Sequence, residues 1–116
     1  MDDKLKYVDI EPRAREELEA AFASEDEHTV CNAMYSAAQH EPDWRWTQGK
    51  LLEFLSHRSL LLRSTAINAL GELVLFRGYV DVEIVLPEVQ KLAGDPALAP
   101  FVDEYLESLK SRIAIQ

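Results

Sequence analysis

The chain has 116 residues, of which 47% are hydrophobic and 28% are charged, and its formal net charge is −9. This length predicts one domain without a separate catalytic module, and the composition argues against a disordered or membrane-spanning chain. The acidic balance argues against nucleic acid as a partner, because phosphate binding depends on Lys and Arg. It favours a basic protein partner, or only keeps the protein soluble.

The acids lie mainly towards the two ends of the sequence. Residues 1–44 carry 12 acids and 4 bases, residues 45–77 carry 2 and 5, and residues 78–116 carry 7 and 3. The charged start Met1-Asp2-Asp3-Lys4 is not followed by an apolar signal core, so we expect a cytoplasmic protein. A lone cysteine, Cys31, agrees with a reducing compartment.

Two helices are predicted in the first third of the chain. Pro12 suits an early position in the first helix, whose apolar residues recur at helical spacing to about Ala23. The segment 24–27 supplies caps and first-turn acids for a second helix that ends near Gln39. Its apolar face consists of Val30, Cys31, Ala33, Met34, Ala37 and Ala38.

Two further helices are predicted after the break at Pro42. Asp43 caps a third helix that ends near His57, and Ser59 caps the fourth. Apolar residues cover more than half of the fourth helix, which must therefore be central and buried. These residues are Leu62, Ala66, Ile67, Ala69, Leu70, Leu73, Val74 and Phe76.

A fifth helix is predicted from Val82 to Leu92, although its β-branched residues leave a strand open for 80–86. Pro87 lies inside this helix, where a proline removes a backbone hydrogen bond and bends the chain. Asp95 and Pro96 restart the chain into a sixth helix. Its inward-facing residues are expected to be Phe101, Val102, Tyr105, Leu106, Leu109 and Ile113.

The segment from Ser59 to Leu73 has the pattern of a helical repeat. A polar cap opens the helix, Arg63 follows one turn later, Ala and Leu recur at helical spacing, and Gly71 would let a neighbouring helix approach closely. This pattern resembles the second helix of a HEAT repeat. The resemblance implies an all-α fold, a right-handed α-solenoid of about three antiparallel helix pairs, and it favours a bent helix over a strand around Pro87.

On this reading the single domain, 1–116, has three parts. They are an amino-terminal capping pair at 1–41, a central repeat at 42–77 and a carboxy-terminal pair at 78–116. Stacked pairs align their second helices along a concave side, and solenoids usually bind their partners there.

Ten residues are candidates for protein binding. Polar residues of the second, fourth and sixth helices form a stripe along the expected concave side, or a plain solvated surface. Two indoles in the third helix lie two positions apart, so they cannot both occupy one core pocket, and one should be partly exposed. Alternatively, the first indole packs inward and the second covers a loop. The candidates are Asn32, Tyr35, Gln39, Trp44, Trp46, Asn68, Glu72, Asp103, Glu104 and Glu107.

No catalytic or metal site is predicted. The dipeptide His40-Glu41 resembles the His-Glu pairs of helical-repeat di-iron hydroxylases, but those sites need several such pairs. His28, His40 and His57 lack the i, i+4 spacing of a metal site on a helix. We therefore expect no enzyme activity, no cofactor and no metal.

A second resemblance concerns function. The segments 43–48 (Asp-Trp-Arg-Trp-Thr-Gln) and 51–55 (Leu-Leu-Glu-Phe-Leu), followed by the helix from Arg63 to Leu73, resemble small HEAT-repeat immunity proteins of bacterial contact-dependent growth inhibition and polymorphic toxin systems. This resemblance implies a monomer that binds a basic toxin domain, often a nuclease, and neutralises it by occlusion. A HEAT-repeat scaffold or adaptor of lyase or chaperone type is the alternative.

Overall fold

The computed structural model describes residues 11–77 and 81–115, with side chains as far as Arg112. These ranges contain helices and no strand, which confirms the all-α class. The six expected helices lie close to their predicted positions. The elements are α2 (Arg15–Phe22), α3 (Glu27–His40), α4 (Trp44–Phe54), α5 (Leu60–Arg77), α6 (Val82–Gln90), the 3₁₀ helix η1 (Lys91–Gly94) and α7 (Ala99–Ile115).

Side-chain caps determine where three of the helices begin. The Asp26 carboxylate accepts hydrogen bonds from the backbone N–H of Thr29 at 3.2 Å and from its hydroxyl at 2.6 Å. The hydroxyl bond lowers the pKa of Asp26. Asp43 accepts from the backbone N–H of Trp46 at 3.2 Å, and Ser59 accepts from that of Leu62 at 3.2 Å. The predicted caps of α3, α4 and α5 are confirmed because each satisfies an otherwise unpaired first-turn N–H.

The start of α2 differs from the prediction. Residues 11–14 are not helical, so the placement of Pro12 in the first helix is wrong. Ala14 takes the capping position with an extended backbone, and its N–H donates to the Glu17 carboxylate at 3.0 Å. Glu17, the acid at the third helical position, therefore caps the first turn of α2, and this helix begins three residues after Pro12.

The segment around Pro87 is helical, so the strand alternative is excluded. Proline has no N–H to donate, and α6 ends at Gln90, three residues beyond it. The chain then tightens into η1 and bends at Asp95 before α7 begins. The fifth predicted helix is thus correct in position and divided into two pieces.

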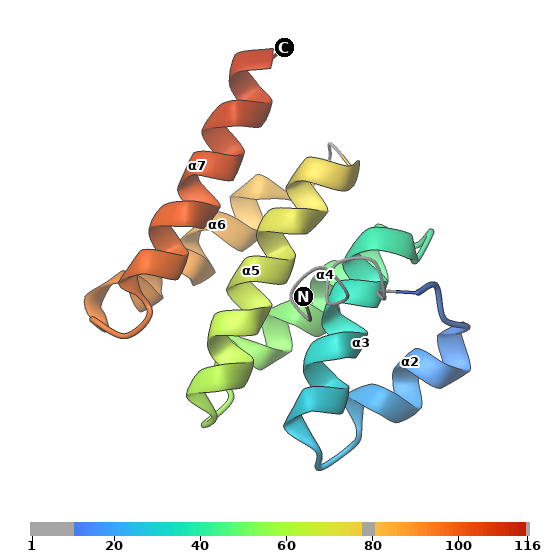
Figure 1. Cartoon of the computed structure of the whole chain (residues 1–116). Helices are drawn as coiled ribbons and strands as arrows, with labels where there is room; N and C mark the ends of the chain where they lie inside the picture. The colour runs from blue at the N-terminus through green and yellow to red at the C-terminus, as the bar shows by residue number, and fades with distance from the viewer. Residues whose placement is uncertain (1–10, 78–80, 116) are drawn as a thin grey trace, which may run out of the picture.

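α5 lies at the centre of the molecule (Figure 1). α3 packs along one flank of α5 and α7 along the other, so the second helix of each predicted pair lies beside the next. α4 packs against both α3 and α5, α2 packs against α3, and η1 contacts α7. The helices α3, α5 and α7 therefore share one layer.

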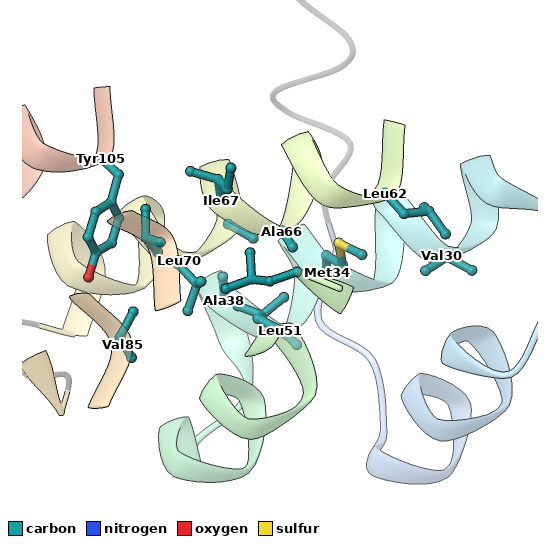
Figure 2. Close-up of a cluster of buried hydrophobic side chains, with 14 of the residues drawn as sticks. Val30, Met34, Ala38, Leu51, Leu62, Ala66, Ile67, Leu70, Val85 and Tyr105 are labelled. Carbon is teal, nitrogen blue, oxygen red and sulfur yellow. The ribbon is translucent and has the colours of Figure 1, made fainter. Parts of the chain in front are cut away.

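One hydrophobic core extends from α2 to α7 and is built around α5. Figure 2 shows its side chains converging from α3, α4, α5, α6 and α7. Tyr105 is 2% exposed, and its hydroxyl has no hydrogen-bond partner in the described part of the chain. Burial raises the pKa of Tyr105 to about 12. The labelled core residues are Val30, Met34, Ala38, Leu51, Leu62, Ala66, Ile67, Leu70, Val85 and Tyr105.

Three expectations about individual positions are corrected or fall outside the structure. Phe76 was expected in the core, but 60% of it is exposed. A Cβ placed on Gly71 would lie 3.5 Å from the Ser108 hydroxyl and 3.9 Å from the Tyr105 ring. These are ordinary contacts, so α7 does not approach α5 closely enough to require glycine. Ile113 lies outside the described side chains.

Candidate protein-binding surface

The polar residues predicted on α3 and α5 meet at one point. The Gln39 side-chain amide donates to a Glu72 carboxylate oxygen at 3.0 Å. Two turns earlier along α5, the Cys31 thiol donates to the Thr65 hydroxyl at 3.3 Å. α3 and α5 are thus joined by a polar seam above their apolar contact. Burial raises the pKa of Glu72, and the bond from Gln39 partly opposes that shift.

The other candidates on α3 and α5 are half-buried. Asn32 accepts a hydrogen bond from the Arg13 guanidinium at 2.8 Å, which ties it to the segment before α2. Tyr35 packs against the hydrophobic core. Asn68 lies one turn before Glu72 on α5. Asn32 and Gln39 lie within about 20° of each other around α3, and Asn68 and Glu72 lie about 40° apart around α5, with part of their polar surface already bound within the molecule. Their role in binding stays a prediction.

The three acids predicted on α7 are all exposed. Glu107 forms an ion pair with Lys110 at 3.6 Å, and both side chains are about three-quarters exposed, so this pair contributes little stability. Ser108 marks the side of α7 that faces α5, through its contact at Gly71. At about 100° per residue, Glu104 lies near Ser108 around the helix and Asp103 lies about 140° away. Asp103 therefore does not share the α5-facing side.

The two tryptophans on α4 have different surroundings, although both are half-buried. Trp46 packs against the core and meets the Phe22 ring edge-on, with ring centroids 5.9 Å apart. The Arg15 guanidinium lies 4.1 Å from the Trp46 ring centroid. Trp44 has the Arg45 guanidinium 4.5 Å from its ring centroid. The expectation that one indole packs inward is met by Trp46, so Trp44 is the better candidate for a partner contact.

Arg15 also organises the turn between α3 and α4. Its guanidinium pairs with Glu41 at 3.0 Å and with Asp43 at 3.3 Å. Only 8% of the Glu41 side chain is exposed, and the Glu41 carbonyl accepts a bond from the Arg77 guanidinium at 2.6 Å. We call the set Arg15, Phe22, Glu41 and Trp46 the α2–α4 junction. Sequence reasoning missed it because its partners lie far apart in the chain.

A second long-range contact joins α4 to the start of α6. The Gln48 amide donates to the Asp81 carboxylate at 3.0 Å and accepts from the Asp81 backbone N–H at 2.9 Å. Arg45 lies 3.8 Å from the same carboxylate. Asp81 thus connects two helix pairs, and no local sequence signal marks that role.

The described residues contain no cluster of three or more His, Cys, Asp or Glu side chains suited to a metal ion. Within the same ranges, no helix is both long and apolar enough to cross a membrane. The surface features that remain are the polar seam, the exposed acids of α7 and several exposed apolar side chains on α5.

Comparison with solved structures gives one informative match. The chain resembles a chain in the crystal structure of a CDI complex from Cupriavidus taiwanensis LMG 19424, with a TM-score of 0.75 and 27% sequence identity. The match covers 85% of this chain and 89% of that chain. This protein is similar to a component of a CDI complex. No protein-family model and no curated protein matches the sequence.

Proposed function

We propose that this protein is the immunity component of a contact-dependent growth inhibition (CDI) system, which binds and neutralises a cognate toxin domain. The observation that carries the proposal is the structural match, because it covers nearly the whole of both chains and comes from a CDI complex. The sequence segments 43–55 and 63–73 point independently to the same class of protein. A complex implies a protein partner, and the partner of an immunity protein is its toxin.

The mode of action we propose is occlusion by a preformed surface. The layer of α3, α5 and α7 supports a HEAT-like solenoid whose second helices line the binding side. A surface held by a continuous core and a polar seam is already ordered before binding, so less free energy is lost in ordering it. The protein would act as a monomer in the cytoplasm.

The chemistry of the chain favours a basic toxin domain, of which a nuclease is one example. A net charge of −9 attracts a basic surface over long range and accelerates encounter at low salt. The exposed acid Glu104 lies on the α5-facing side of α7, where it would face the cations of a nuclease cleft in place of nucleic-acid phosphates.

Co-expression tests this function. On this proposal we expect a toxin to be encoded beside this gene. Its carboxy-terminal domain should stop bacterial growth when expressed alone, and growth should recover when this protein is co-expressed. A toxin domain from an unrelated CDI system is the matched control, and it should remain toxic. Continued growth arrest with the neighbouring toxin, despite soluble expression of both proteins, would remove the immunity proposal.

A further inference from the structure

Exposed apolar side chains are concentrated on the helix that is otherwise most central. Six large hydrophobic residues are exposed in the described ranges, and four of them belong to α5. They are Leu60 at 45%, Leu61 at 41%, Leu75 at 50% and Phe76 at 60% exposed. They form one pair at each end of α5, and such a pair is a candidate interaction site, whereas single exposed apolar residues are normal on a protein surface.

Helical spacing places several of these residues on one line. At about 100° per residue, Leu61, Asn68, Glu72 and Leu75 fall within roughly 60° of one another around α5, and Phe76 lies about 40° from Glu72. We call these five residues the α5 stripe. The same spacing puts Arg63 and Arg77 on the opposite side of the helix, so neither arginine of α5 lies on the stripe.

Charged groups of both signs flank the α5 stripe, and its own carboxylate is that of Glu72. On one side α3 itself contains neither Lys nor Arg, although the Arg13 guanidinium bonds to Asn32, two turns before Gln39 on the same side of α3. On the other side Ser108 faces Gly71, with Glu104 one turn before it and the half-buried Arg112 one turn after it on α7. The Arg77 guanidinium donates a hydrogen bond to the backbone carbonyl of Glu41, away from the stripe. The stripe therefore combines exposed apolar groups with the carboxylates of Glu72 and Glu104, while Arg13 and Arg112 lie at its flanks.

We propose that the α5 stripe is the contact surface for the toxin domain, with a cationic side chain of that domain at Glu72 and apolar contacts at Leu75 and Phe76. This inference rests on the proposed function. The half-buried Glu72 carboxylate is already partly desolvated, so pairing with a cation costs less there than at a fully solvated acid. The Phe76 ring, one turn beyond Glu72, would contact the alkyl stem or the charged group of that Lys or Arg of the toxin domain.

Isothermal titration calorimetry with the purified neighbouring toxin domain tests the inference. Phe76→Ser should raise the Kd at least about tenfold, as expected for an aromatic anchor, and Glu72→Gln should raise it by roughly tenfold. Ile84→Ser is the matched control, because Ile84 is 55% exposed and lies on α6, outside the layer of α3, α5 and α7. We expect that variant to change the Kd by less than about twofold.

The outcomes separate the two proposals. No binding by the unsubstituted protein overturns both the proposed function and the stripe. Tight binding by the unsubstituted protein, with Phe76→Ser and Glu72→Gln no weaker than Ile84→Ser, overturns the stripe alone. Phe76 is exposed and Glu72 is half-buried, so circular dichroism checks that both variants remain folded.

A second copy of this chain is the competing occupant of the stripe. Light scattering of the free protein distinguishes it. A dimer that Phe76→Ser converts to a monomer, with unchanged affinity for the toxin domain, assigns the stripe to self-association and overturns the proposal. A monomer whose toxin affinity depends on Phe76 supports it.

Discussion

At the α2–α4 junction an aromatic ring and charged groups contact one another, whereas on the α5 stripe the same kinds of side chain face solvent. Trp46 contacts both Phe22 and the Arg15 guanidinium, and that guanidinium also pairs with the buried Glu41. On the stripe, Phe76 and Leu75 are at least half exposed beside the half-buried Glu72. Residue type therefore does not separate structural from binding roles, and the surroundings of each side chain do.

This difference divides the chain between stability and recognition. Substitutions at the junction should lower the free energy of unfolding, while substitutions on the stripe should leave it nearly unchanged and weaken binding. Substitutions at the two regions test this division through unfolding and binding measurements.

The largest effect on stability is expected at Trp46. Trp46→Ala removes a large ring packed against the core, and we expect a loss of about 2–3 kcal/mol in the free energy of unfolding, less than for a fully buried tryptophan. Trp44→Ala is the control, with an expected loss below about 1 kcal/mol. Urea denaturation measures both. Equal losses for the two variants would mean that the junction is not a distinct structural unit.

Removal of the junction's cation should have a smaller effect. Arg15→Met leaves the buried Glu41 without its charged partner, which should lower the free energy of unfolding, although by less than Trp46→Ala does. Arg45→Met removes a guanidinium that is 71% exposed and 3.8 Å from Asp81, so its cost should be under about 0.5 kcal/mol. Thermal and urea unfolding of the two variants give the comparison. A larger loss for Arg45→Met would transfer the structural role to the α4–α6 contact.

Gly71 provides a prediction of the opposite sign. An added methyl would make only ordinary contacts with α7, and alanine favours a helix over glycine, so Gly71→Ala should stabilise by about 0.5–1 kcal/mol. Gly49→Ala, where nothing lies within 4 Å of the new Cβ, is the unobstructed reference. If Gly49→Ala stabilises and Gly71→Ala destabilises, α5 and α7 pack too closely at Gly71 to admit the methyl group.

The smallest effect concerns the pH dependence contributed by Glu72. Burial raises the pKa of this carboxyl above its ordinary value of 4.5, so the folded state holds the proton more tightly than the unfolded state does. Its contribution to stability is therefore fully present below pH 4.5 and is lost as pH rises through the raised pKa.

Glu72→Gln should remove that contribution to the pH dependence. Relative to the unsubstituted protein, the variant should gain stability between pH 4 and pH 7 by a few tenths of a kcal/mol, roughly the size expected for a solvent-screened group. Urea unfolding at the two pH values measures the difference. If Glu72→Gln instead loses stability relative to the unsubstituted protein between pH 4 and pH 7, the fold favours the charged form of the Glu72 carboxyl group.

Helical spacing and capping predicted most of the fold. The caps at Asp43 and Ser59 are visible in sequence because each partner lies three residues away. The sequence placed Gln39 and Glu72 on one polar stripe, but it did not predict the hydrogen bond between them. Caps and helix faces depend on short spacing or on a regular repeat, and both are readable from one sequence.

Contacts between distant segments were not predictable in the same way. Arg15 and Glu41 are separated by 26 positions, and Gln48 and Asp81 by 33, with no motif at either end. Phe76 was placed in the core because α5 is apolar around most of its circumference, and composition cannot show which flank lacks a covering helix. The α5 stripe, the feature most relevant to function, therefore required the packed structure.

Site-specific photo-crosslinking tests the central claim most directly. A benzoylphenylalanine in place of Phe76 keeps an aromatic ring at the stripe, and irradiation with the neighbouring toxin domain should give one covalent product of the combined mass. The same probe in place of Trp46, at the junction, or Ile84, on α6, should give little or none. Crosslinking from either of those positions, with none from position 76, would contradict the assignment of binding to α5.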